Sequence, residues 1–230
     1  MSFTSACVLP LCISTADQAL YQSDFLALEL PTLAAPPSSP RGTVLVWGGA
    51  SACGACAIQL LVLSGYEVYA TSSPRNFEFC KGLGAAQMFD YNQPDVVDGI
   101  VTALKGTQIA GVFDTISLDE TLKACCRIAA KVGYHGTIAA TLEMEDELEA
   151  ELKEIRGGEV KIMSTFAPAI VKTELAGKIW REFLPEAIRT GRILPRPEAW
   201  VVGSGLEALQ TGLDRMREGV SARKVVVELV

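Results

Sequence analysis

The segment GGASACG at residues 48–54 has the residue types of a phosphate-binding turn. It lies between two apolar runs, TVLVW (43–47) and residues 52–64, which predict a strand before it and a helix after it. Glycine lets a backbone turn tightly and approach a pyrophosphate, and the amides and dipole of a helix N-terminus attract its charge. The residues that we expect to bind a diphosphate here are Gly48, Gly49, Ala52, Cys53 and Gly54. A plain strand-to-helix turn is the alternative.

The next predicted strand, YEVYAT (66–71), ends in a polar group that bears on the choice of cofactor. A site for NAD places an acid there to bind the ribose hydroxyl, whereas this sequence continues with SSPRN (72–76). Hydroxyls and a cation suit the 2′-phosphate of NADP(H), so we expect Ser72, Ser73 and Arg75 to bind it. The alternative is that the two serines only cap the following helix.

Four side chains outside these turns could take part in proton transfer: Asp17, Tyr91, Tyr134 and His135. Asp17 lies in an otherwise apolar segment, where burial would raise its pKa toward that of a general acid or base. His135, the single histidine, stands between two glycines, and imidazole is a common proton-transfer group. The plainer alternatives are a surface carboxylate for Asp17 and a loop residue for His135. The catalytic candidates are Asp17, Tyr91 and His135.

The seven cysteines include one CxxC pair, Cys53 and Cys56. This spacing suits redox chemistry or metal binding, but zinc needs further Cys or His ligands, and His135 lies on a different predicted element. Most of the cysteines fall in apolar helical patterns, where cysteine behaves as a small hydrophobic residue. We therefore predict structural cysteines and no metal site.

Predicted strands and helices alternate from residue 43 onward, which is typical of an α/β fold with a doubly wound parallel sheet. Strands are expected at 43–47, 66–71, 86–91, 109–116, 131–141, 160–166 and 224–229, and helices at 52–64, 76–83, 95–104, 118–129, 143–154, 170–190 and 205–217. A buried helix with a kink or late start at Pro10 is expected over 3–21, before a Pro- and Ser-rich linker at 31–42. The predicted divisions are a leading helix and linker (1–41), a dinucleotide-binding domain (42–194) and a C-terminal segment (195–230).

The composition, 49% hydrophobic and 20% charged over 230 residues, predicts a packed globular core. A net charge of −7 with scattered Lys and Arg argues against a nucleic-acid partner. No apolar run reaches the length of about 18 residues expected of a membrane-spanning helix. Residues 6–13 are apolar but lack the basic residues and cleavage site of a signal peptide. We expect a cytoplasmic protein without a membrane partner.

Five blocks of the sequence carry a family likeness: ACVLPLCISTADQALYQ (6–22), VWGGASACGACAIQL (46–60), ATSSPRNFEFCKGLGAAQMFDY (70–91), FDTIS (113–117) and SARKVVVEL (221–229). In this order they resemble the medium-chain dehydrogenase/reductase superfamily. The likeness is greatest to its zinc-free branch of quinone reductases and fungal enoyl reductases that serve polyketide synthases in trans. The resemblance covers nearly the whole chain and implies a Rossmann fold that binds NADP(H).

The resemblance also implies roles for single residues. Thr15 matches a residue near the nicotinamide, Tyr91 matches one beside the adenosine, and Asp114 and Ile116 fall near the cofactor. The strand at 160–166 matches an edge strand through which such enzymes often pair, so the resemblance implies a homodimer.

Two departures from the family pattern lead to further expectations. Such enzymes carry a barrel-like catalytic domain ahead of the segment with which this sequence begins. Residues 195–230 are therefore expected to be the remnant of a lost domain, packed on the core. Ala50 and Ala52 stand where relatives commonly have serine, and each lost hydroxyl–phosphate hydrogen bond would weaken binding by about 1 kcal/mol.

The first hypothesis for function is an NADP(H)-dependent oxidoreductase. It would transfer a hydride to an activated alkene or carbonyl of a small apolar or polyketide-like substrate, with the chemistry carried by the cofactor. One alternative is a repurposed scaffold that catalyses a non-redox step of secondary metabolism, such as cyclisation, isomerisation or dehydration. Another is a non-catalytic dinucleotide-binding partner protein.

Overall fold

A six-stranded parallel sheet forms the centre of the computed structural model, which describes residues 1–35, 37–156 and 160–229. The strand order is β3-β2-β1-β4-β5-β6, and every neighbouring pair is parallel. The strands are β1 Thr43–Trp47, β2 Glu67–Ser72, β3 Gln87–Asp90, β4 Ile109–Asp114, β5 Thr137–Ala140 and β6 Lys161–Ser164. The predicted doubly wound α/β fold is confirmed.

Both faces of the sheet are buried, and alternate residues of each strand enter different cores. In β1, Val44 and Val46 belong to one apolar cluster, and Leu45 and Trp47 belong to the other. Side chains of a strand point to opposite faces in turn, so a strand covered on both sides is apolar throughout. This explains why TVLVW has no polar face.

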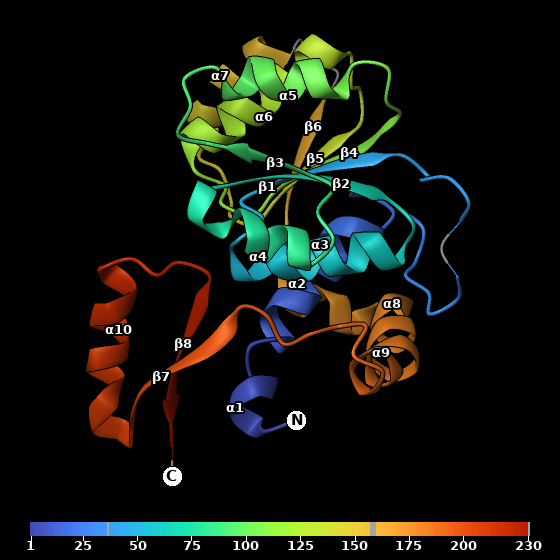
Figure 1. The fold of residues 1–230 in the computed structure, drawn as a ribbon. Helices are drawn as coiled ribbons and strands as arrows, with labels where there is room; N and C mark the ends of the chain where they lie inside the picture. The colour runs from blue at the N-terminus through green and yellow to red at the C-terminus, as the bar shows by residue number, and fades with distance from the viewer. Residues whose placement is uncertain (36, 157–159, 230) are drawn as a thin grey trace.

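Helices cover the two faces in two groups (Figure 1). The first group, α2 Pro10–Tyr21, α3 Ala52–Leu63 and α4 Phe77–Gly82, packs in the cluster that contains Val44 and Val46. The second group, α5 Val96–Leu104, α6 Asp119–Val132 and α7 Asp146–Arg156, covers the opposite face. Carboxyl ends of parallel strands gather at one sheet edge, and β2 and β4 flank β1 on opposite sides, so a crevice is expected where β1 and β4 end.

The N-terminal helix is divided before Pro10, as expected, into α1 Phe3–Ala6 and α2. Contrary to the sequence-based expectation, Phe3–Tyr21 is long and apolar enough to cross a membrane by length and composition. More than half of it, 56%, is buried in the structure, and α2 packs along α3. We therefore interpret this apolar segment as a core helix that packs on α3.

The predicted helix over 170–190 starts later than expected and is irregular. A 3-10 segment, η2 Ala167–Lys172, precedes one unbroken helical run made of α8 Glu174–Ala176, the π-helical η3 Gly177–Phe183 and α9 Leu184–Arg189. Pro185 has no amide to donate, and its ring displaces the carbonyl one turn earlier. A widened π turn directly before Pro185 accommodates both effects.

The predicted strand over 131–141 is also too long. Helix α6 continues to Val132 and ends at Gly133, whose φ of +68° is the left-handed conformation that favours glycine at a helix end. Strand β5 begins only at Thr137. Tyr134 and His135 therefore lie before the strand, at the amino edge of the sheet.

The C-terminal part forms a second, two-stranded parallel sheet of β7 Glu198–Ser204 and β8 Arg223–Glu228, joined through η4 Leu206–Ala208 and α10 Leu209–Arg217 (Figure 1). Side-chain hydrogen bonds tie this part to the core. The Gln59 side chain of α3 binds the backbone of Leu194 twice, with Leu194 N at 2.7 Å and Leu194 O at 3.2 Å. The boundary at residue 195 stays a prediction, and the bonds to Gln59 hold the chain directly before it.

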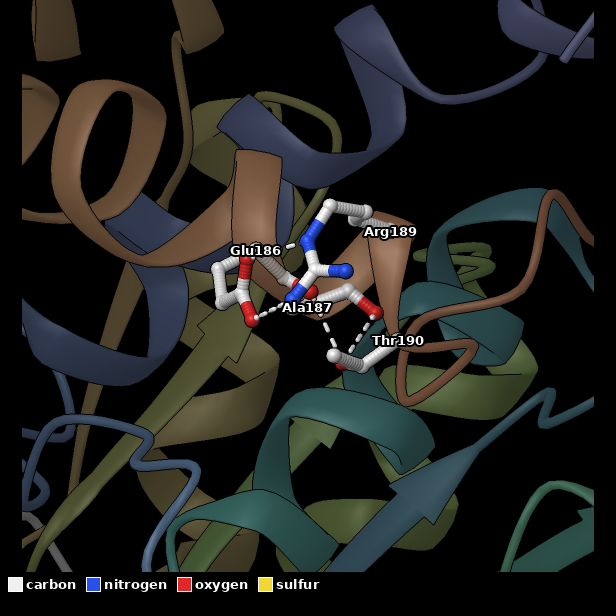
Figure 2. A network of polar contacts seen from close by, with 4 residues as sticks. All are labelled: Glu186, Ala187, Arg189 and Thr190. Atoms are coloured by element: carbon white, nitrogen blue, oxygen red, sulfur yellow. Dashed lines mark hydrogen bonds and ion pairs between the residues drawn. The ribbon is translucent and has the colours of Figure 1, made fainter.

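We predict that Gln59→Ala lowers the free energy of unfolding by about 1–3 kcal/mol, because it removes both bonds and leaves the Leu194 amide and carbonyl without a partner. Urea denaturation with a backbone-sensitive signal measures the change. The matched control is Glu186→Gln on α9 (Figure 2), where an exposed carboxylate pairs with Arg189 at 2.6 and 2.7 Å. Exposed pairs contribute little, so its midpoint should stay unchanged. Equal midpoints for wild type and Gln59→Ala would contradict this role of the Gln59 bonds.

Candidate functional site

The turn from β1 to α3 is built on glycines that approach other backbone closely. Gly48 has φ of +86°, and its amide donates to Thr71 Oγ1 at 2.9 Å. A Cβ on Gly54 would lie 2.3 Å from the Gly48 carbonyl oxygen and 2.9 Å from the Gly49 Cα. No side chain fits there, so the glycines of GGASACG are required by packing.

The N-terminus of α3 leaves amides for an anion. Ser51 caps the helix, since its Oγ accepts from the Gly54 amide at 2.9 Å. The same Oγ lies 2.8 Å from Thr115 Oγ1, which fixes the cap against the end of β4. The Ala52 and Cys53 amides, in the first turn, have no intrahelical acceptor. A negatively charged group is favoured at such a helix end.

A cavity of about 190 Å³ opens beside this turn, at the carboxyl edge of the sheet. Its lining residues are Gly48, Ala50, Ser51, Ser72, Ser73, Arg75, Asn76, Tyr91, Ile116, Val220, Ser221 and Ala222. The structure thus brings together six of the residues predicted to bind the cofactor: Gly48, Ser72, Ser73, Arg75, Tyr91 and Ile116. The part of the lining formed by Val220, Ser221 and Ala222 was not predicted, although the block SARKVVVEL (221–229) carried the family resemblance.

One end of the cavity gathers hydroxyls and a cation. Arg75 is exposed and makes no ion pair with any residue that the structure describes. The Asn76 amide donates to Ser73 Oγ at 3.2 Å and to Ser221 Oγ at 2.9 Å, which joins the end of β2 to the C-terminal part of the lining. The Ser72 hydroxyl donates to the Ser73 carbonyl at 3.1 Å. An unpaired guanidinium beside hydroxyls suits a phosphate.

Other predicted cofactor residues support the site without lining the cavity. Asp114 is buried, and its Oδ1 accepts from the amides of Ile116 and Ser117 at 2.9 and 3.0 Å. It therefore positions Ile116, which does line the cavity. Thr15 donates to Leu11 O on its own helix at 2.9 Å. The predicted residues outside the lining are Thr15, Gly49, Ala52, Cys53, Gly54 and Asp114.

The catalytic candidates lie apart. Tyr91 follows β3 and lines the cavity with 45% of its surface exposed. His135 is exposed and lies at the amino edge of β5 with Tyr134, away from the carboxyl edge where the cavity opens. Neither Asp17 nor His135 is among the residues that line the cavity. Of the three candidates, the structure brings only Tyr91 to it.

Asp17 is not the surface carboxylate of the plainer alternative. The residue is 0% exposed, and neither carboxylate oxygen has a hydrogen-bond partner among the residues that the structure describes. Burial raises its pKa from 3.8 to about 7, because a charge without partners is poorly solvated inside a protein. Asp17 is a buried acid on α2 whose proton can be exchanged near neutral pH.

The residues described do not fit a metal site, since they contain no group of three or more His, Cys, Asp or Glu side chains able to hold an ion. The glycine cradle and the hydroxyls with Arg75, by contrast, fit a phosphorylated dinucleotide.

Comparison with known families decides the relationship. The family model described as zinc-binding dehydrogenase matches residues 52–184, more than half of the chain. The chain belongs to this family. Relatives that match over the whole chain include the trans-enoyl reductase himH of Aspergillus japonicus, 34% identical, and the dehydrogenase pigH of Monascus ruber, 36% identical. The chain spans 63% and 66% of the length of these relatives.

Solved structures share the fold of this chain. The CurK enoyl reductase matches all of this chain with a TM-score of 0.78 at 22% identity, and this chain covers 64% of it. A structure of CurA in complex with NADPH from Vibrio vulnificus matches 94% of the chain with a TM-score of 0.66 at 15% identity, and 62% of that structure is covered. These likenesses support the Rossmann fold of this member of the medium-chain dehydrogenase/reductase superfamily.

The buried acid gives a pH prediction. The unfolded chain releases the Asp17 proton near its ordinary pKa of 3.8, whereas the folded chain holds it up to about pH 7. Between these values the folded state binds more protons, so Asp17 makes the protein less stable as pH rises, and the effect levels off above about pH 7. Asp17→Asn carries no charge. Its stability relative to wild type should rise from pH 4 to pH 8 by at most about 4 kcal/mol.

Thermal or urea unfolding of both proteins across this pH range measures the difference. Parallel stability curves for Asp17→Asn and wild type would show that folding does not raise the pKa of the Asp17 carboxyl.

The glycine cradle gives a second prediction. Gly54→Ala should lower stability by more than about 2 kcal/mol and weaken dinucleotide binding, because the backbone of the turn must shift to admit the Cβ. The matched control is Gly99→Ala on α5, where a Cβ meets nothing within 4 Å. It should be neutral or stabilising by about 0.5–1 kcal/mol. Denaturation and calorimetric titration measure both effects, and equal behaviour of the two variants would contradict the close approach.

Proposed function

We propose that this protein is an NADP(H)-dependent oxidoreductase that transfers a hydride to an activated alkene or carbonyl of an apolar, polyketide-like substrate. The observation that carries the proposal is the cavity beside the β1–α3 turn. It is lined by Ser51 at the start of α3 and by Ser72, Ser73 and Arg75, and Arg75 makes no ion pair with the described residues. A dinucleotide with a 2′-phosphate has charged groups that match both features.

The residues of the chain would divide the binding among them. The Ala52 and Cys53 amides would donate to the diphosphate, and the turn at Gly48 leaves room for its approach. Ser72, Ser73 and Arg75 would hold the 2′-phosphate. When bound, the nicotinamide would supply the hydride. The protein would position the cofactor and exclude water.

Other residues enter the proposal through the family resemblance. Tyr91 would lie beside the adenosine, and Ile116 would contact the cofactor from the end of β4, held by Asp114. Thr15 would lie near the nicotinamide. The missing hydroxyls at Ala50 and Ala52 would weaken phosphate binding without removing the backbone amides.

The substrate class rests on relatives. The names trans-enoyl reductase and dehydrogenase given to relatives over 30% identical support reduction of an alkene or carbonyl. Because the chain spans less than two thirds of himH and pigH, activity and substrate remain proposals for this chain. No observation favours the non-redox alternative, since the proton-transfer candidates do not converge on one cavity.

The proposal includes a homodimer in the cytoplasm. Strand β6 lies at the edge of the sheet, with β5 as its single neighbour. Its outer backbone groups could pair with β6 of a second copy and extend the sheet.

The preference for phosphorylated cofactor is testable at Arg75. Wild type should bind NADPH at least about 10-fold more tightly than NADH, since a charge-assisted hydrogen bond to phosphate contributes about 1.5–3 kcal/mol. Arg75→Ala should lose most of this preference and leave NADH affinity unchanged. Calorimetric titration measures all four affinities, with Arg189→Ala as a control that removes an exposed arginine elsewhere.

Equal affinity for NADPH and NADH would contradict the 2′-phosphate assignment. No binding of either would remove the dinucleotide function. If NADPH binds, its oxidation with enoyl thioesters, enones and quinones then tests hydride transfer, and failure with all of them would remove the reductase proposal.

A further inference from the structure

Two cysteines and a lysine meet behind the phosphate-binding turn. Lys224 of β8 lies 3.3 Å from the sulfur of Cys12 on α2, and it also donates to the carbonyl of Val8 at 3.4 Å. Cys53, in the first turn of α3, packs against the apolar cluster that contains Cys12, and the two thiols interact with each other. All three cysteines of this region, Cys12, Cys53 and Cys56, are free. Three segments far apart in the sequence therefore place two thiols in contact beside one ammonium group.

The contacts give the two thiols different roles. The interaction with Cys53, together with the adjacent charge of Lys224, lowers the pKa of Cys12 to about 6 despite its burial. The same contact with Cys12, together with burial, raises the pKa of Cys53. A thiolate is the nucleophilic form of cysteine, so Cys12 is the group that attacks and Cys53 the thiol that can resolve the product.

The CxxC spacing points to a different pair, and the structure does not favour it. Cys56 is fully buried in α3, and burial raises its pKa. It has no cation in hydrogen-bond contact, whereas Cys12 has Lys224. Cys53 therefore has its reactive partner on another helix rather than three residues along its own.

We propose that Cys12 and Cys53 form a reversible disulfide when the protein meets hydrogen peroxide. The Cys12 thiolate attacks one peroxide oxygen, the O–O bond breaks, and hydroxide leaves, which oxidises Cys12 to a sulfenic acid. Cys53 then attacks the Cys12 sulfur, the S–O bond breaks, and water forms with the Cys53 proton. Two thiols and one peroxide thus give one disulfide and two waters. Cys12 is only 3% exposed, so a small oxidant is required.

The disulfide would act on the proposed cofactor site. Cys53 carries one of the two helix amides without an intrahelical acceptor, and a covalent bond to α2 would fix that turn in a new position. We expect the oxidised protein to bind NADPH at least about 10-fold more weakly, as the loss of one good hydrogen bond to phosphate predicts. This consequence rests on the proposed function, whereas formation of the disulfide does not.

The experiment exposes the reduced protein to hydrogen peroxide and follows disulfide formation by mass spectrometry. Wild type should lose two hydrogens, and peptide mapping should join residue 12 to residue 53, with reversal by dithiothreitol. Lys224→Met should slow the reaction about 10-fold by raising the pKa of Cys12, and Lys224→Arg should retain the rate. In Cys53→Ser, a dimedone probe should trap the sulfenic acid on Cys12.

Matched controls are Cys7→Ser and Cys56→Ser, which should leave the bond and its rate unchanged. A bond between Cys53 and Cys56, no bond at all, or equal rates in wild type and Lys224→Met would overturn the proposal. Calorimetric titration with NADPH measures the affinity of the reduced and of the oxidised protein, and this result is independent of the disulfide mapping. If the reduced protein does not bind NADPH, the proposed function fails while the mapped disulfide still stands.

Discussion

The contact between Gly54 and the backbone of Gly48 sets the geometry on which the rest of the site depends. A side-chain carbon at Gly54 would come within 2.3 Å of the Gly48 carbonyl oxygen, so α3 can rest against β1 only without one. That approach brings the cap residue Ser51 to Thr115, and thereby joins the ends of β1, α3 and β4. The cavity opens at this junction because the chain leaves β1 and β4 toward helices on opposite faces of the sheet.

Much of this architecture follows from local pattern. TVLVW and the helix after it are apolar along their whole length. Strands buried on both faces of a parallel sheet need such uniformly apolar sequences, so the pattern predicted the fold, which is confirmed. The serines and Arg75 after β2 were predicted to lie together because they follow one strand end, and all three line the cavity. Such features depend on residues that lie a few positions apart, and local backbone geometry fixes how these residues are arranged.

Features that depend on distant residues could not be predicted in this way. The hydrogen bond between Asn76 and Ser221 joins residues 145 positions apart, and no local sequence pattern predicts it. The CxxC spacing drew attention to Cys56, while the partner of Cys53 comes from α2. Pro185 was visible in the sequence, but its effect is a π turn within a helix that was expected to be regular. The burial of Asp17 fits its apolar neighbours, but its lack of partners depends on tertiary packing.

The part of the cavity lining at 220–222 has a consequence for how binding and folding influence each other. These residues belong to the C-terminal part of the chain, which the core holds through a few polar contacts, including the bond between Asn76 and Ser221. A ligand that occupies the cavity touches both parts at once. A ligand that binds more tightly when residues 220–222 are in place raises the population of molecules in which the C-terminal sheet is docked on the core. By the same linkage, docking strengthens the affinity for that ligand by the same factor. The cavity is therefore a point of thermodynamic coupling between two layers of the molecule that share no strand.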